Sequence, residues 1–235
     1  MNIFERFQGV FASPKKTLEA VAEKPVWVDA LIILLVVLAV HTYIITPIMQ
    51  TETLATFRDN VKLQERLGKD RFEQYLKSQE NPSPTRRLVT SLGITPVTSA
   101  VGFLISSLFL LIFGRIVSTT GTFKAVLAVF LHANFIDKIL GNAVRLAIIL
   151  SRKSIFQTTT SLALFFPKMS FTSPAYIVLS QVDFFQLWMF GVLGYGLAAV
   201  FKIELKKAMI VSYAFFVIKS VIYIALGFLS RSFLS

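Results

Sequence analysis

The side chains of this chain that could do chemistry are concentrated in one apolar stretch, Phe130–Leu150, with the sequence FLHANFIDKILGNAVRLAIIL. The stretch is long enough for a helix to cross a bilayer. A charged side chain at the bilayer centre costs at least about 2.5–3.5 kcal/mol, so such groups usually mark a binding or transport site or a polar contact between helices. The polar residues of the stretch are His132, Asn134, Asp137, Lys138, Asn142 and Arg145.

Five of these six side chains are predicted to share one face of a helix. At about 100° per residue they fall within one arc of about 140°, and His132 alone lies on the opposite face. The stripe either lines a polar cavity or transfer path, or it is satisfied by neighbouring helices. Lys219, midway along the last apolar block, adds a cation, whereas Asp137 is the only acid deep inside a block. We therefore expect surplus positive charge that needs water, backbone carbonyls, a lipid phosphate or a bound anion.

The residue types argue against a metal centre, a cofactor site or an enzyme. His132 has no second histidine three or four residues away, and the only other one is His41, whereas a zinc site needs three or four ligands. The chain has no cysteine, which excludes disulfides, thiol catalysis and cysteine-bound metals. No nucleophile elbow, paired carboxylates or phosphate-binding loop is present. We predict no catalytic residues, no metal and no cofactor.

The elements that must hold these residues are predicted to be membrane-spanning helices. Hydrophobic residues make up 54% of the 235 residues, charged residues only 16%, and the mean hydropathy is +0.67. The apolar residues gather in blocks of the length that a hydrocarbon core requires, and lipid leaves the backbone no partner outside a helix or closed barrel. We expect an all-α polytopic bundle of about five spans, Val26–Met49, Gly93–Gly114, Ala125–Leu150, Asp183–Phe201 and Ala208–Ser230.

The charge of the chain is assigned to the membrane surface. The net charge is +11, and most lysines and arginines lie between the apolar blocks, which is typical of orientation signals and contact with anionic lipids. Nucleic acid is therefore not expected as a partner. The short connections KIELKK and GRIVSTTGTFK favour a cytoplasmic N-terminus. The first residues lack the pattern of a signal peptide, so insertion is expected through the first span.

Two segments outside the blocks have an amphipathic or polar character. Residues 1–25 are predicted to form two short helices that lie either at the lipid head groups or against the protein's own spans. Residues 26–235 form the membrane domain, which contains a polar helical insertion at 50–92. The mixed charges of this insertion indicate a solvated face or a docking surface.

Local signals predict helix starts and close helix contacts. Thr95-Pro96 predicts an N-cap followed by proline at the start of the second span. Asp183 and Gln186 have the spacing of a capping box at the head of the fourth. The pairs Gly102/Ser106 and Gly194/Ala198 have the small-residue spacing of close helix packing, which we assign to contacts within the chain.

Two stretches resemble the Yip family, whose members are named for interaction with Ypt/Rab GTPases, and specifically its bacterial branch. GVFASPKKTLEAVAEKPVWVDALIIL, residues 9–34, is similar to the family's opening. VDFFQLWMFGVLGYGLAAVFKIELKKA, residues 182–208, is similar to its Asp-x-Phe-x-x-Trp segment and the glycine-bearing span that follows. The matching positions are Asp183, Phe185, Gln186, Trp188, Gly194 and Gly196.

The resemblance implies a five-span bundle in the bacterial cytoplasmic (inner) membrane, with the N-terminus in the cytosol and no catalytic residues to transfer. Bacteria have no Rab proteins, so the traffic role of eukaryotic relatives does not carry over. We predict a non-enzymatic scaffold or adaptor that interacts with membrane lipids and with a membrane-protein partner or a second copy of itself. The alternative is a transporter or channel-like component that uses the third-span stripe with Lys219.

Overall fold

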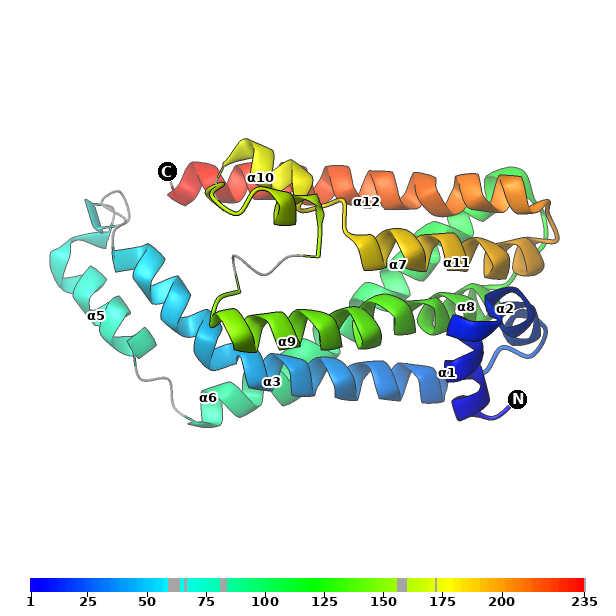
Figure 1. The fold of residues 1–235 in the computed structure, drawn as a ribbon, viewed down its shortest axis with the longest axis horizontal. Helices are drawn as coiled ribbons and strands as arrows, with labels where there is room; N and C mark the ends of the chain where they lie inside the picture. Colours follow the sequence, from blue (N-terminus) through cyan, green and yellow to red (C-terminus); the bar gives the residue numbers. More distant parts are fainter. Residues whose placement is uncertain (59–63, 66, 81–83, 156–159, 172, 235) are drawn as a thin grey trace.

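The computed structural model describes residues 1–58, 64–65, 67–80, 84–155, 160–171 and 173–234, and its helices run side by side along one long axis (Figure 1). Within the described residues the only β pairing is an isolated bridge between Ser161 and Asp183. The all-α fold is therefore confirmed. In the part of the chain that the structure describes, four helical stretches are long and apolar enough to cross a membrane: Val28–Ala55, Pro84–Val117, Phe184–Phe201 and Leu205–Ser230.

The stretch expected to form the third span is the central helix of the bundle. It consists of α8 (Phe123–Asn134), the π-helix η2 (Phe135–Gly141) and α9 (Asn142–Arg152). It is not among the four apolar stretches, and every residue from Ala125 to Asp137 is buried. A helix with this many polar groups is placed at least cost where protein rather than lipid surrounds it. A bilayer crossing by this helix stays a prediction.

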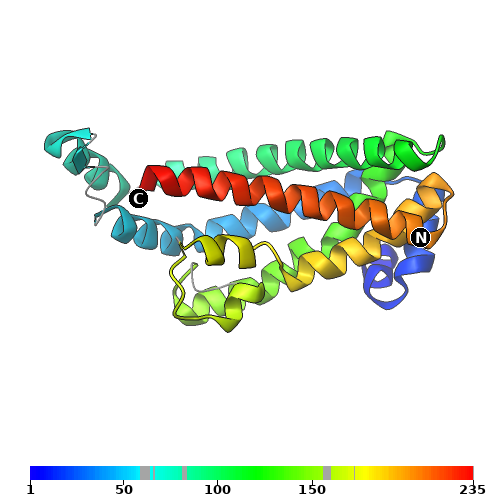
Figure 2. The same ribbon diagram turned by 90° about the horizontal axis from the view of Figure 1, so that it is seen from above.

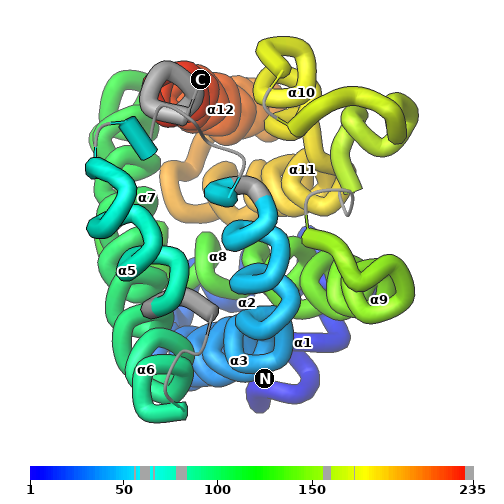
Figure 3. The backbone as a smooth tube through the Cα atoms, turned by 90° about the vertical axis from the view of Figure 1, so that its left-hand side faces the viewer, coloured from blue at the N-terminus to red at the C-terminus, as the bar shows by residue number. Residues whose placement is uncertain are grey.

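The other long helices surround this central one (Figure 3). They are α3 (Val28–Arg58), α7 (Thr95–Val117), α11 (Phe184–Phe201) and α12 (Leu205–Leu234). Their outer faces carry exposed aliphatic side chains, as a surface in contact with lipid requires. Examples are Ile32, Val36 and Val40 on α3, Val97, Val101 and Leu104 on α7, and Val217 and Val221 on α12.

The N-terminal helices α1 (Ile3–Ala12) and α2 (Pro14–Glu23) pack against one end of the bundle, on α8 and α11. Packing against the protein's own helices is one of the two arrangements predicted for residues 1–25, and a position at the lipid head groups stays a prediction. Val10 and Leu18 are completely buried there. The buried guanidinium of Arg6 donates a hydrogen bond to the Asp29 carboxylate in the first turn of α3. An apolar stripe and one ion pair therefore hold these helices to the bundle.

The polar insertion projects beyond the opposite end of the bundle (Figures 1 and 2). The end of α3 and α5 (Lys69–Glu80) form this projection, in which the rings of Phe57 and Tyr75 meet edge to face at 5.8 Å. Residues 59–63, 66 and 81–83 of the expected insertion lie outside the described residues. The N-terminus and C-terminus lie at opposite ends of the bundle.

The predicted N-cap at Thr95 is wrong. The helix that contains Thr95 begins upstream as α6 (Pro84–Leu88), continues as the π-helix η1 (Val89–Ile94) and enters α7 without a break. Pro96 has no N–H and its ring crowds the carbonyl four residues earlier, in a straight α-helix. The wider turn of η1 accommodates this crowding, so the proline lies inside a helix rather than at its start.

The connection from α9 to α11 folds back along the bundle. It contains the short helices η3 (Leu162–Phe165) and α10 (Pro174–Leu179), and α10 packs on α12. Backbone hydrogen bonds of 3.0 Å from Leu162 N to Val182 O and 3.1 Å from Phe184 N to Thr160 O join its two ends. As a result α11 begins part-way along the bundle, beside the central helix (Figure 1).

Candidate functional site

The π-helix η2 sets the orientation of the polar residues on the central helix. Asp137 and Arg145 are eight residues apart, and in a regular α-helix their side chains would point about 80° apart. The π-helical turn advances each residue by less than an α-helical one, which brings Arg145 towards the side of Asp137. Arg145 Nη2 lies 2.7 Å from Asp137 Oδ1, and its Nη1 lies 3.2 Å from the Asp137 carbonyl.

Arg145 is the centre of a buried polar network. Its Nη2 also lies 2.8 Å from Asp183 Oδ1, and its Nη1 donates to Asn142 Oδ1 at 2.9 Å. Nε donates to the Thr160 hydroxyl at 3.0 Å, and that hydroxyl donates to the other Asp183 oxygen at 2.5 Å. The guanidinium therefore joins the central helix to the start of α11, with all three of its nitrogens engaged.

Asp183 has a role that its sequence position only partly indicates. Its Oδ1 accepts from the backbone N–H groups of Phe185 and Gln186 at 2.9 and 3.1 Å, so it caps α11 as expected. It is 5% exposed and paired with Arg145, so it is a second buried acid in the bundle interior. Asp183 lies at the N-cap of α11 and not inside an apolar block, so Asp137 is still the acid that lies within a block.

Gln186 does not complete a capping box. Its Oε1 accepts a hydrogen bond of 2.5 Å from Lys219 Nζ on α12 instead. The Lys219 ammonium also lies 5.5 Å from the Phe190 ring centroid and 5.8 Å from that of Tyr223. Within the described residues, no carboxylate forms an ion pair with Lys219.

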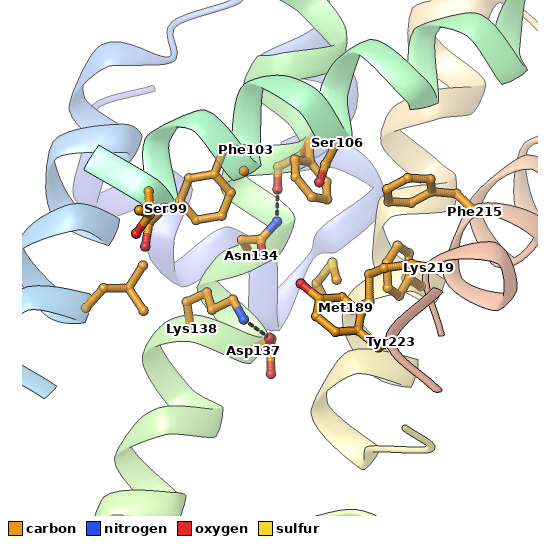
Figure 4. Close-up of a pocket in the computed structure, with 15 residues that line it drawn as sticks. Ser99, Phe103, Ser106, Asn134, Asp137, Lys138, Met189, Phe215, Lys219 and Tyr223 are labelled. Carbon is orange, nitrogen blue, oxygen red and sulfur yellow. Dashed lines mark hydrogen bonds and ion pairs between the residues drawn. The ribbon is translucent and has the colours of Figure 1, made fainter. Parts of the chain in front are cut away.

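A cavity of about 330 Å³ lies between the central helix and the helices α3, α7, α11 and α12. Figure 4 shows Asn134, Asp137 and Lys138 on one side of it and Lys219 and Tyr223 on the other. Lys138 Nζ forms an ion pair with Asp137 Oδ2 at 2.8 Å, yet 34% of its side chain is exposed. The polar residues predicted to form a site therefore fall into two groups. Asn134, Asp137 and Lys138 of the stripe border the cavity together with Lys219, whereas Asn142 and Arg145 do not.

The polar wall that α7 contributes to this cavity was not predicted. Thr98, Ser99, Gly102 and Ser106 all border it. Gly102 and Ser106 were assigned to close helix packing, which is wrong for Gly102, because a Cβ there would meet nothing within 4 Å. The signal that could have found this wall is the recurrence of the small residues Ser99, Gly102 and Ser106, which share one helix face.

The other family-motif positions pack the helices together. Phe185 is buried, and its ring lies 5.6 Å from the Arg145 guanidinium carbon. Trp188 meets the ring of Phe11 on α1 at 6.1 Å. A Cβ on Gly194 would lie 2.4 Å from Met209 Sδ, and one on Gly196 would lie 2.7 Å from Val129 Cβ. These glycines let α11 approach α12 and α8 closely, as expected within one chain.

His132 lies on the opposite side of the central helix and is completely buried. Its Nδ1 is 2.8 Å from the Ala128 carbonyl, its ring packs on Phe135 at 5.3 Å, and its Nε2 has no hydrogen-bond partner in the described structure. Among the described residues no cluster of three histidine, cysteine or acidic side chains is placed to hold a metal. His132 therefore serves as a packing residue in this structure.

The site combines a fixed network of ion pairs with Lys219, a cation that borders the cavity. The cations Lys138, Arg145 and Lys219 outnumber the two acids Asp137 and Asp183, which leaves one positive charge uncompensated in the described part of the site. Asp137 is held by two cations, so it is poorly placed to accept a proton from a substrate. The cavity is therefore suited to binding a negatively charged group rather than to acid–base chemistry.

A family model for the Yip1 domain matches residues 9–227, which contain every residue of the site described above. Neither the comparison with curated proteins nor that with solved structures gives a match.

Proposed function

The chain belongs to the Yip1 domain family, and from this premise we propose that it is a non-enzymatic scaffold or adaptor of the bacterial cytoplasmic membrane that binds lipid through its interior cavity. The observation that supports this most directly is the polar cavity inside a bundle whose outer faces are aliphatic. Aliphatic outer faces of this kind contact membrane lipid, and the cavity offers a lipid a polar binding site within the membrane.

The geometry supports binding rather than turnover. Asp137, the acid that borders the cavity, forms ion pairs with Lys138 and Arg145, and the π-helical turn that positions it is packed against α11 and α3. π-Helical turns inside α-helices are frequent at functional sites. A fixed network of this kind is typical of a site that holds a ligand in one orientation.

The lipid-binding role can be tested by native mass spectrometry of the full chain in mild detergent. We expect the wild-type protein to retain lipid through repeated detergent washes, and Ser106→Phe, which fills the cavity, to lose it. Leu108→Phe adds the same side chain to the exposed face of α7 and serves as the matched control. Wild-type protein that is free of lipid after the first wash, and that elutes as a monomer with no partner, would overturn the proposal.

Transport is the second candidate, and the charged lining of a cavity at mid-length of the helices favours it. Charged groups within membrane helices frequently mark transport paths. Asp137→Asn and Lys138→Met change these charges with little change of volume. If both variants insert and fold, and the function of the protein in cells is unaffected, the transport hypothesis is rejected.

A further inference from the structure

The cavity has one cation whose charge is not balanced. Arg145 is engaged by Asp137 and Asp183, and Lys138 by Asp137. Among the described residues, Lys219 instead has a hydrogen bond to the neutral amide of Gln186 and the rings of Phe190 and Tyr223 nearby, but no carboxylate. An ammonium group has three N–H donors, and a buried charge is costly unless a counter-charge or several hydrogen bonds satisfy it. The environment of Lys219 therefore has room for an anion.

The remaining lining supplies hydrogen-bond donors around that position. Lys138, whose side chain is 34% exposed, borders the same cavity, and so do the hydroxyl-bearing residues Ser99, Ser106 and Tyr223. Two ammonium groups and several hydroxyls form the donor set that phosphate oxygens require. A water molecule occupies about 30 Å³ in the liquid, so the cavity holds about ten and can take a phosphate group but not acyl chains.

The rim of the cavity reaches the lipid-facing surface between α7 and α12. Thr98 and Gly102 on α7 are exposed, and so is 54% of Tyr223 on α12. At Gly102 a side chain would meet nothing within 4 Å, which leaves the flank of α7 open. On the same helix, Gly114 instead has the ring of Phe201 within 2.0 Å of its ideal Cβ. Gly102 therefore marks a gap, not a helix contact.

From these observations we propose that the cavity binds the phosphate of an anionic phospholipid, which reaches Lys219 and Lys138 from the side, past Gly102. This proposal rests on the lipid-binding role and names its ligand class. Lys219 lies midway along α12, about 21 Å from either end at 1.5 Å per residue, so the phosphate is drawn below the ordinary head-group level. Contact with both lysines offsets this displacement, because each charge then has a counter-charge. The acyl chains stay outside, along the aliphatic faces of α7 and α12.

The test is a titration of the delipidated full chain with phosphatidylglycerol or phosphatidylcholine, followed by native mass spectrometry. We expect phosphatidylglycerol to bind more tightly, and Lys219→Met to weaken it about tenfold, since a hydrogen bond to a charged group is lost. Lys206→Met, at the exposed start of α12, is the matched control and should bind as the wild type does. Lys219→Arg keeps the charge and should retain binding, which gives a second variant if Lys219→Met does not fold.

The access route and the source of the phosphate are tested separately. Gly102→Leu should block binding of phosphatidylglycerol, whereas Gly93→Leu, at another position on the same helix with open space around it, should not. Inorganic phosphate alone should not displace the lipid at millimolar concentration. Three outcomes would each overturn this inference. They are equal binding of the two lipids, no effect of Lys219→Met and Gly102→Leu on binding, and displacement of the lipid by inorganic phosphate. If no lipid of either kind binds the wild type, the lipid-binding role itself fails.

Discussion

Arg145 on α9 and Asp183 at the start of α11 form a partly buried ion pair of 2.8 Å, although 38 residues separate them in the sequence. The same guanidinium nitrogen holds Asp137 at 2.7 Å. The pair therefore fixes the start of α11 against the π-helical turn of the central helix. Because Gln186 lies in the first turn of α11, this contact also determines where Lys219 finds its amide partner.

Arg145→Met should strongly destabilise the bundle, because it leaves the buried carboxylates of Asp137 and Asp183 without their common cation. Breaking a buried pair on one side typically costs about 3–5 kcal/mol. Equilibrium unfolding in mixed micelles measures this loss, and Lys206→Met on the surface should change the free energy of unfolding by no more than about 0.5 kcal/mol.

A double-mutant cycle gives the decisive comparison for this pair. Asp183→Asn removes the negative charge that Arg145→Met leaves without a cation. The free energy of unfolding lost in the double variant should therefore be smaller than the sum of the two single losses by about 0.5–3 kcal/mol. Strict additivity would show that Arg145 and Asp183 do not depend on each other, contrary to the network described here.

Three glycines should respond to alanine in a fixed order. A Cβ at Gly196 meets Val129 Cβ, which is attached to the backbone and cannot move away, so Gly196→Ala should cost about 1–3 kcal/mol. Gly194→Ala meets the flexible end of Met209 and should cost less. Gly102→Ala meets nothing and should gain up to about 1 kcal/mol from helix propensity. Thermal unfolding in detergent ranks the three, and a loss at Gly102 equal to that at Gly196 would contradict the open gap.

The ion pair between Arg6 and Asp29 should respond differently to loss of either partner. Arg6 is 5% exposed and its Nε has no hydrogen-bond partner in the described structure, whereas 37% of the Asp29 side chain is exposed. Asp29→Asn leaves the buried guanidinium without its counter-charge and should loosen α1, whereas Arg6→Met puts an apolar side chain in an apolar site and should cost less. Hydrogen exchange of the amides in α1 measures this, and faster exchange in Arg6→Met than in Asp29→Asn would refute it.

The sequence was sufficient for those features that depend on composition or on one helix alone. The apolar blocks predicted the helices, and the cost of charge in lipid predicted that Asp137 and Lys138 face inward. Partners that come from another helix could not be predicted. Asp183 was recognised as a cap but not as a partner of Arg145, since only the folded-back segment before α11 brings it into the interior.

The errors at Thr95 and Gly102 have a common physical cause. A proline can lie at a helix start or, where a π-helical turn relieves the crowding by its ring, inside a helix. A glycine can lie at a close contact between two helices or beside a gap. Local sequence cannot distinguish these, because the neighbouring helix decides which is present. Local sequence also could not show how the stripe divides. Its residues point either to the cavity or to the Arg145 network because the π-helix η2 changes the angle between successive side chains on the central helix.

The orientation of the bundle can be determined by cysteine labelling, for which a chain without native cysteine is well suited. α2 lies at one end of the bundle and α5 beyond the other. The connections that carry Thr120 and Lys202 lie at the end of α2, because both residues border the same surface hollow as Glu19. Arg115 and Lys124 flank the first of these connections, and Lys202, Lys206 and Lys207 lie in or next to the second. Lysine and arginine near the ends of spans are retained on the cytoplasmic side.

We therefore predict that Lys16→Cys in α2 faces the cytoplasm and Arg71→Cys in α5 faces the opposite side. A membrane-impermeant maleimide should label Arg71→Cys in right-side-out vesicles and Lys16→Cys in inverted ones, with permeabilised vesicles as the control for reactivity. The opposite pattern would reverse the orientation and leave the fold intact. Labelling of both positions from one side would instead show that the long axis of the bundle does not cross the membrane, because the two helices lie at its opposite ends.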